Sequence, residues 1–121
     1  MNVDELIKAY YTGYELKKWE TIERLLAERF TFTSPNDDDH LDIQTYKTRC
    51  WPQAEFIKRF EFESVLRGDG EAFVKYLCTT TEGTNFRNTE YFRFSSGKIA
   101  AVEVYFGGRL GYPTASVAGQ S

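Results

Sequence analysis

Apolar and polar residues alternate through residues 85–106, and this pattern predicts two β-strands joined in a hairpin. The connecting turn falls at 95–98, where Ser-Ser-Gly-Lys supplies the small residues that a tight turn requires. Side chains alternate between the two faces of a strand, so one face of the first arm carries Phe86, Asn88, Glu90, Phe92 and Phe94. Buried polar groups need hydrogen-bond partners. We therefore expect Asn88 and Glu90 to line a pocket among the three rings.

Apolar side chains spaced three and four residues apart predict helices in the first half of the chain. The first helix spans 3–16, and a second spans about 19–28 with almost no linker between them. A third helix is expected at 43–50. Asn2 and Asp42 directly precede the first and third helices, and both residue types are good N-caps.

Shorter alternating segments predict three further strands, at 29–34, 60–67 and 71–81. The acidic segment 36–42 is expected to form a loop, and 53–59 has no clear pattern. Helices followed by a meander of antiparallel strands indicate an α+β fold. In such a fold a curved sheet wraps around the helices and leaves a hollow lined by aromatic side chains.

Length and composition narrow the class of protein. With 121 residues the chain suits a single domain, expected at 1–107, followed by a loosely ordered tail at 108–121. A net charge of -3 argues against a groove for nucleic acid, and no apolar run approaches the ~20 residues that span a bilayer. No signal peptide is visible at the start, and Cys50 and Cys78 suit free thiols in a reducing compartment. We expect a cytoplasmic protein whose partners include neither nucleic acid nor a membrane.

Several segments together resemble the nuclear transport factor 2-like superfamily: IKAYY, WETIERLLAERFTFTSP, CWP, RGDGEAFVKY and FRNTEYFRFSSGKIAAVEVYFG. The chain is most similar to the small SnoaL-like members of this superfamily, which are also grouped under a cystatin-like fold. The resemblance implies a cone-shaped α+β barrel with helices packed in the concavity of a mainly antiparallel sheet. It also implies an internal pocket for a small apolar ligand and a homodimer formed through the outer face of the sheet.

The superfamily contains steroid isomerases, dehydratases, epoxide hydrolases and polyketide cyclases, so the fold alone does not assign an activity. In the steroid isomerases a tyrosine of the first helix donates a hydrogen bond to the enolate, and the matching residue here is Tyr10. Their base is an aspartate before a proline, but this chain has Ser34 before Pro35. The cyclase-type acid that follows the last strand is replaced by Gly107. Neither mechanism is intact, and whether the protein is an enzyme stays open.

The candidate ligand-binding residues are Tyr10, Tyr14, Trp51, Asn88, Glu90 and Tyr105. The candidate catalytic residues are Glu90, Tyr10 and His40. Each has a structural alternative. Glu90 can belong to a structural hydrogen-bond network, paired with an arginine such as Arg87 or Arg93 on a neighbouring chain or strand. His40 can be a solvated residue of the acidic loop, and the rings can simply pack the core. Which face of the last strand is turned inward stays open as well.

The sequence offers little for a metal or a cofactor. One histidine and two distant cysteines do not make a zinc site, and segment 36–42 lacks the spacing of a Ca²⁺ loop. Glycine-rich nucleotide-binding motifs are not found, so no cofactor is expected.

These patterns favour a domain that binds a small, mostly apolar molecule. One alternative is an isomerase, a dehydratase (a lyase) or a hydrolase, with Glu90 or an Asp or His of segment 37–42 as the acid and Tyr10 as the hydrogen-bond donor. A second alternative is a non-catalytic domain for dimerisation or assembly, with the hollow filled by side chains.

Overall fold

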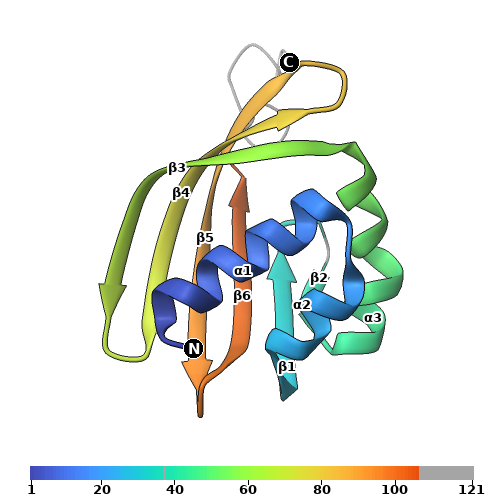
Figure 1. Cartoon of the computed structure of the whole chain (residues 1–121). Helices are drawn as coiled ribbons and strands as arrows, with labels where there is room; N and C mark the ends of the chain where they lie inside the picture. The colour runs from blue at the N-terminus through green and yellow to red at the C-terminus, as the bar shows by residue number, and fades with distance from the viewer. Residues whose placement is uncertain (37, 107–121) are drawn as a thin grey trace, which may run out of the picture.

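A six-stranded sheet curves around helix α1 (Val3–Leu16) in the computed structural model, which describes residues 1–36 and 38–106 (Figure 1). The strands lie in the spatial order β2 (Asp38–Leu41), β1 (Leu26–Ser34), β6 (Lys98–Phe106), β5 (Asn85–Ser95), β4 (Glu71–Thr80) and β3 (Ile57–Gly68). Strands β1 and β6 run parallel, and every other neighbouring pair is antiparallel. The predicted tail 108–121 and Gly107 lie outside the described residues.

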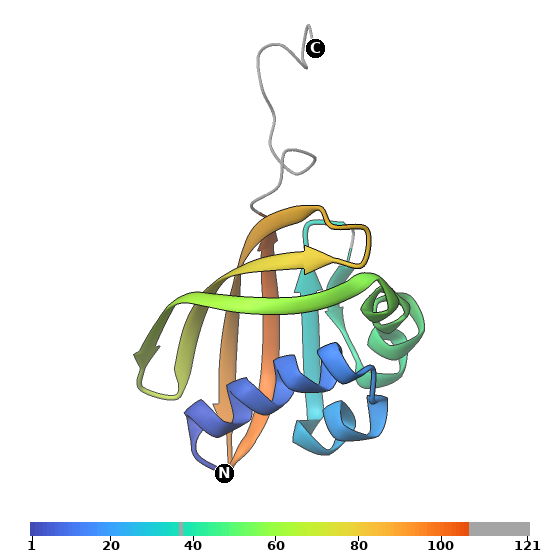
Figure 2. The same cartoon turned by 45° about the horizontal axis from the view of Figure 1, so that its top comes forward.

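Three further helical segments complete the fold: α2 (Trp19–Leu25), α3 (Ile43–Arg49) and the 3₁₀ helix η1 (Trp51–Phe56). Helix α1 runs across the concave side of the sheet in both views, and α2 and α3 lie toward the β1 end (Figures 1 and 2). The α+β fold with helices in the concavity of a mainly antiparallel sheet is therefore confirmed. The sheet remains open rather than closing into a complete barrel.

The predicted caps explain where two helices begin. Asn2 accepts a hydrogen bond from the backbone N–H of Glu5 at 2.8 Å, and the Glu5 carboxylate accepts one from the Asn2 N–H at 2.9 Å. Together these bonds form a capping box at the start of α1. At α3 the carboxylate of Asp42 accepts from the N–H of Thr45 at 2.9 Å.

The hydrophobic core lies between the helices and the concave face. Alternate residues of β4 point into it, as do Asn88, Glu90 and Phe92 of β5. Val102 and Val104 of β6 are buried on this same face, because they pair with Phe92 and Glu90. The prediction that Asn88 and Glu90 lie on the inner face of β5 is thus confirmed. On β6 the inner face is the one that carries Val102 and Val104.

Two boundaries differ from the prediction. Helix α2 ends at Leu25, and β1 already begins at Leu26, because the backbone there pairs with β6 at Ile99. The side chain of Leu26 is buried in the strand as it would be in a helix, so the apolar spacing could not separate the two states. Strand β3 likewise begins at Ile57, within the segment that had no clear pattern.

The prediction of a loop at 36–42 is wrong for its second half. Residues Asp38–Leu41 form the short strand β2, with Asp38 opposite Ser34 and Leu41 opposite Phe32. The acidic sequence lacks the apolar alternation of a typical strand. Strand β2 forms because its backbone pairs with the edge of β1 that faces away from β6.

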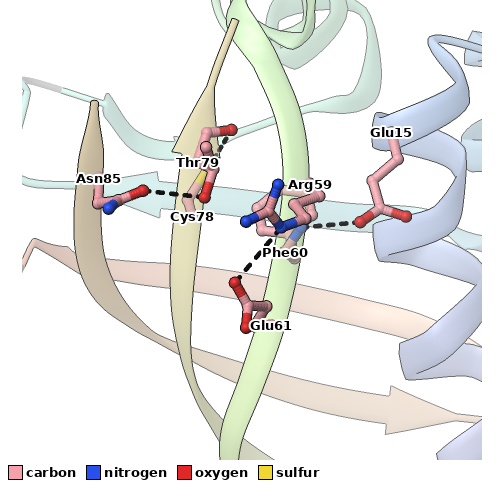
Figure 3. Close-up of polar contacts among 7 residues, drawn as sticks. All are labelled: Glu15, Arg59, Phe60, Glu61, Cys78, Thr79 and Asn85. Atoms are coloured by element: carbon pink, nitrogen blue, oxygen red, sulfur yellow. Dashed lines mark hydrogen bonds and ion pairs between the residues drawn. The ribbon is translucent and has the colours of Figure 1, made fainter. Parts of the chain in front are cut away.

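Strand β3 lies at the opposite end of the sheet, and α1 covers part of its unpaired edge. The carboxylate of Glu15 on α1 accepts a hydrogen bond from the backbone N–H of Phe60 at 2.7 Å (Figure 3). An exposed strand edge can pair with other chains, and a side chain bonded to it reduces that tendency.

No helix in the described part of the chain is both long and apolar enough to cross a membrane.

Candidate functional site

A cavity of about 120 Å³ lies between α1 and the concave face of the sheet. Its walls carry aromatic rings and a few polar groups from α1, η1 and all six strands. The lining residues are Tyr10, Tyr11, Tyr14, Phe32, Ser34, Asn36, Asp38, Cys50, Gln53, Ile57, Phe60, Tyr76, Phe86, Asn88, Glu90 and Val104. Of these, Asn36 and Gln53 are exposed, so the cavity reaches the surface of the protein near these two residues.

Glu90 is the central polar group of the cavity wall, and only 8% of it is exposed. One carboxylate oxygen accepts a hydrogen bond from the hydroxyl of Tyr11 at 2.6 Å, and the other accepts one from Tyr76 at 2.8 Å. The amide nitrogen of Asn88 in turn donates to the Tyr76 hydroxyl at 3.2 Å. Burial raises the pKa of Glu90, because it penalises the charged form, while the two phenol donors act in the opposite direction.

A second polar cluster joins α1 to α3. The hydroxyl of Tyr46 is 2.5 Å from that of Tyr10 and is also hydrogen-bonded to that of Tyr14. Burial raises the pKa of all three phenols above the ordinary value, so they stay neutral at physiological pH. Tyr46 is fully buried behind the wall, and it therefore fixes the positions of the two lining tyrosines.

Asp38 supplies a second carboxylate to the cavity, from the short strand β2. Its side chain accepts a hydrogen bond from the Ser34 hydroxyl at 2.8 Å and forms an ion pair with Arg49 of α3, also at 2.8 Å. Nearby, burial and the negative charge of Asp38 raise the pKa of the Cys50 thiol to about 12. That thiol is therefore protonated at neutral pH and is a poor nucleophile.

The family-model comparison matches the SnoaL-like domain over residues 7–102. This match covers most of the chain. The chain belongs to the SnoaL-like domain family. No functionally curated protein is significantly similar to its sequence.

Solved structures support the same fold for this SnoaL-like domain. An NTF2-like protein of unknown function from Cytophaga hutchinsonii superposes with a TM-score of 0.71 at 16% identity, over 88% of this chain and 90% of that chain. A proposed ketosteroid isomerase from Kribbella flavida has a TM-score of 0.72 at 15% identity, over 93% and 82%. AclR, a proposed hydroxylase from Streptomyces galilaeus, has a TM-score of 0.71 at 12% identity, over 88% and 75%. At these identities the similarity establishes the fold alone.

The structure brings four of the predicted site residues of the SnoaL-like domain together at one cavity: Tyr10, Tyr14, Asn88 and Glu90. Trp51 lies behind this wall, where its ring packs against those of Tyr14 and Trp19.

Two predicted residues lie away from the cavity. Tyr105 is 51% exposed on the outer face of β6, and its hydroxyl donates to Glu103 at 2.6 Å, so the structure does not place it with the ligand-binding candidates. His40 is exposed and has its ring nitrogen 2.6 Å from the carboxylate of Asp39. A role as proton shuttle would require it to reach a cavity that it does not line.

Glu90 does lie in a buried hydrogen-bond network, as the structural alternative proposes, but no arginine of the described residues takes part in it. Arg87 lies on the opposite face of β5 and binds both carboxylate oxygens of Glu63 at 2.9 Å, and Arg93 is exposed on that same face. The partners of Glu90 are the phenols of Tyr11 and Tyr76, which the sequence analysis did not name. Their signal was present: Tyr11 adjoins Tyr10 on the first helix, and Tyr76 alternates with Val74 and Cys78 on β4.

Asp38 was predicted only as one of several acids in segment 37–42. Its neighbour Asp37 lies outside the described residues. Among the described residues, no group of three or more His, Cys, Asp or Glu side chains is arranged to hold a metal ion.

Proposed function

We propose that this SnoaL-like domain binds a small, mostly apolar molecule in the cavity beneath α1. The observation that carries the proposal is the position of Glu90, a buried carboxylate held inward among aromatic rings by Tyr11 and Tyr76. Well-packed apolar residues often stabilise a core as well as buried charged groups do. A carboxylate fixed in such surroundings is therefore better explained by a bound molecule than by stability alone.

The size of the cavity limits the ligand. A volume of about 120 Å³ is below the roughly 300–1,000 Å³ of common small-molecule sites. A designed apolar cavity of roughly 150 Å³ takes up benzene. We therefore propose a ligand of about the size of one ring. The four fused rings of a steroid exceed this space, which argues against steroid isomerisation in this chain.

A search for ligands followed by a cavity-filling variant tests the proposal. Compounds with one ring or a compact branched skeleton would be screened by saturation-transfer NMR, and hits measured by titration calorimetry. Val104→Phe places a ring in the cavity wall and should abolish binding. Overpacking of this kind costs about 1–3 kcal/mol, so folding of the variant would be checked by thermal unfolding.

Leu66→Phe is the matched control, because it also adds a ring but lies exposed at the far end of β3. It should leave binding unchanged. Binding that survives in Val104→Phe would place the ligand elsewhere. A screen without any hit, together with nothing co-purified by mass spectrometry, would favour the assembly role.

A second candidate function is acid–base catalysis, and the position of Asp38 favours it. This carboxylate lines the same cavity as Glu90 and is oriented by Ser34 and Arg49. Two carboxylates on one cavity suit proton transfer by an isomerase or a lyase. In that case Asp38→Asn would abolish turnover of a bound compound while keeping its affinity. Turnover that persists in this variant would exclude Asp38 as the base.

We also propose that two copies of the chain pair through the outer face of the sheet. Phe73 and Tyr105 are half-exposed there, and the ring centre of Phe73 lies 5.0 Å from that of Tyr91. Sedimentation over a concentration series tests the pairing. Phe73→Glu should shift the protein to monomer, and an unchanged mass would contradict this interface.

A further inference from the structure

The two carboxylates of the cavity differ in their charge partners. Asp38 is neutralised by the guanidinium of Arg49 at 2.8 Å. Glu90 receives hydrogen bonds only from neutral groups, and no Lys, Arg or His of the described residues forms an ion pair with it. None of these cationic residue types lines the cavity either, within the part of the chain that the structure describes.

The Glu90 carboxylate, when ionised, has unused hydrogen-bond acceptor positions and no cationic partner among the described residues. An ionised carboxylate offers about four acceptor positions, and the phenols of Tyr11 and Tyr76 occupy two of them. It also has no positive charge beside it among the described residues, and buried charged groups in proteins are normally paired. Because Glu90 lines the cavity, a bound molecule can supply both the missing donor and the missing charge.

The rest of the wall suits a cation with alkyl groups. Aromatic rings attract cations to their faces through the ring quadrupole, and they also provide apolar contact. Seven such rings line the cavity beside Glu90: Tyr10, Tyr11, Tyr14, Phe32, Phe60, Tyr76 and Phe86.

We propose that the cavity recognises a small alkylammonium ion, whose charge lies against Glu90 and whose alkyl groups lie against the rings. This inference rests on the proposed ligand-binding function and names the chemical class of the ligand. The cavity volume of about 120 Å³ admits a compact branched ion and excludes larger amines.

A pair of compounds with the same shape separates charge from size. tert-Butylammonium and tert-butanol have the same carbon skeleton and differ in the charged group. Both would be titrated into the full chain at pH 7 and constant ionic strength, with binding followed by NMR and calorimetry. The cation should bind at least about tenfold more tightly, because it adds an attraction between opposite charges to the hydrogen bond that the alcohol can also donate to the carboxylate.

Glu90→Gln removes the charge and keeps the size of the side chain. Binding of tert-butylammonium should weaken by roughly 10- to 100-fold, while that of tert-butanol should weaken by about fivefold or less, because the alcohol loses no ion pair. Glu61→Gln is the matched control, because it removes one carboxylate charge from an exposed position on β3. It should alter neither affinity.

A second measurement uses the unsubstituted protein and does not depend on the folding of a variant. Tetramethylammonium carries a permanent charge, so pH changes only the protein. The titratable groups that face Glu90 are Tyr10, Tyr11 and Tyr14 from α1 and Tyr76 and Cys78 from β4. Burial raises the pKa of each, so they are neutral below pH 8. Affinity should rise with pH as Glu90 ionises, with a proton released on binding.

The other carboxylate of the cavity is Asp38, and the variant Asp38→Asn tests whether Asp38 contributes to binding of the cation. The rise in affinity with pH should persist in this variant. A rise that disappears there would assign the cation to Asp38 and overturn the role of Glu90.

The outcomes separate this inference from the function on which it rests. Equal binding of tert-butanol and tert-butylammonium, or an affinity for tetramethylammonium that is independent of pH, would overturn the cation and leave small-molecule binding in place. Failure of the cations and of every neutral compound in the screen would overturn both.

Discussion

Ser34 donates a hydrogen bond to Asp38 across the antiparallel pair of β1 and β2, with 2.8 Å between hydroxyl and carboxylate oxygen. Ser34, the last residue of β1 and the residue before Pro35, is thus bonded to an acid supplied by the neighbouring strand. Asp38 reaches the cavity because β2 pairs with the end of β1, and Arg49 holds it from α3.

Replacing Ser34 with alanine should lower the free energy of unfolding by about 1 kcal/mol, because the buried carboxylate loses one donor while keeping Arg49. Urea denaturation at pH 7 measures the change. Ser95→Ala, at an exposed position at the end of β5, is the control and should have a smaller effect. Equal losses in the two variants would show that the bond to Asp38 contributes nothing.

The stability of the protein should depend on pH through Glu90. Burial raises the pKa of its carboxyl above the ordinary 4.5, so the folded state favours the protonated form. The contribution of this group is fully present below pH 4.5 and is lost as the pH rises through the folded-state pKa. The stability of the protein relative to Glu90→Gln should therefore fall as the pH increases above 4.5. Urea denaturation of both proteins at a series of pH values measures this difference, and parallel curves would contradict it.

Tyr46→Phe should lower the free energy of unfolding by about 1–3 kcal/mol, because the buried hydroxyls of Tyr10 and Tyr14 both lose their shared partner. Tyr91→Phe is the comparison, since its hydroxyl binds Glu71 on the exposed face of the sheet. That variant should change stability by about 0.5 kcal/mol or less. A similar loss of stability in both variants would mean that the buried hydrogen bonds of Tyr46 stabilise the protein no more than the exposed one of Tyr91 does.

Asn2→Ala should destabilise the start of α1 by about 1 kcal/mol, since it removes the acceptor for the Glu5 N–H. Asn2→Asp keeps the acceptor and should retain stability. Hydrogen exchange of the amides in the first turn of α1 provides the measurement. Unchanged protection in Asn2→Ala would show that the capping box is dispensable.

Much of the fold follows from local chemistry that is visible in the sequence. The alternation in 85–106 sets the hairpin and turns Asn88 and Glu90 inward, and the side chains of Asn2 and Asp42 mark helix starts. These features depend on neighbouring residues alone, so the sequence is sufficient to predict them.

The features that were missed depend on partners distant in the chain. Strand β2 exists because β1 offers a free backbone edge, and Leu26 joins a strand because β6 lies beside it. Period-two alternation gives two faces without saying which is inward, which is why Tyr105 was assigned to the site. The phenols of Tyr11 and Tyr76 meet Glu90 only after the sheet has curved around α1.

The parallel pair of β1 and β6 also affects the order in which the chain folds. Thr31 pairs with Ala101, so β1, which lies in the first third of the chain, can complete its pairing only after β6 has been synthesised. Contacts this distant in sequence slow folding. Until β6 leaves the ribosome, β1 lacks its neighbour on one side, although Phe30 can already pack against Tyr46 of α3. A nascent chain that stops before residue 98 therefore exposes part of the apolar core and is prone to aggregate.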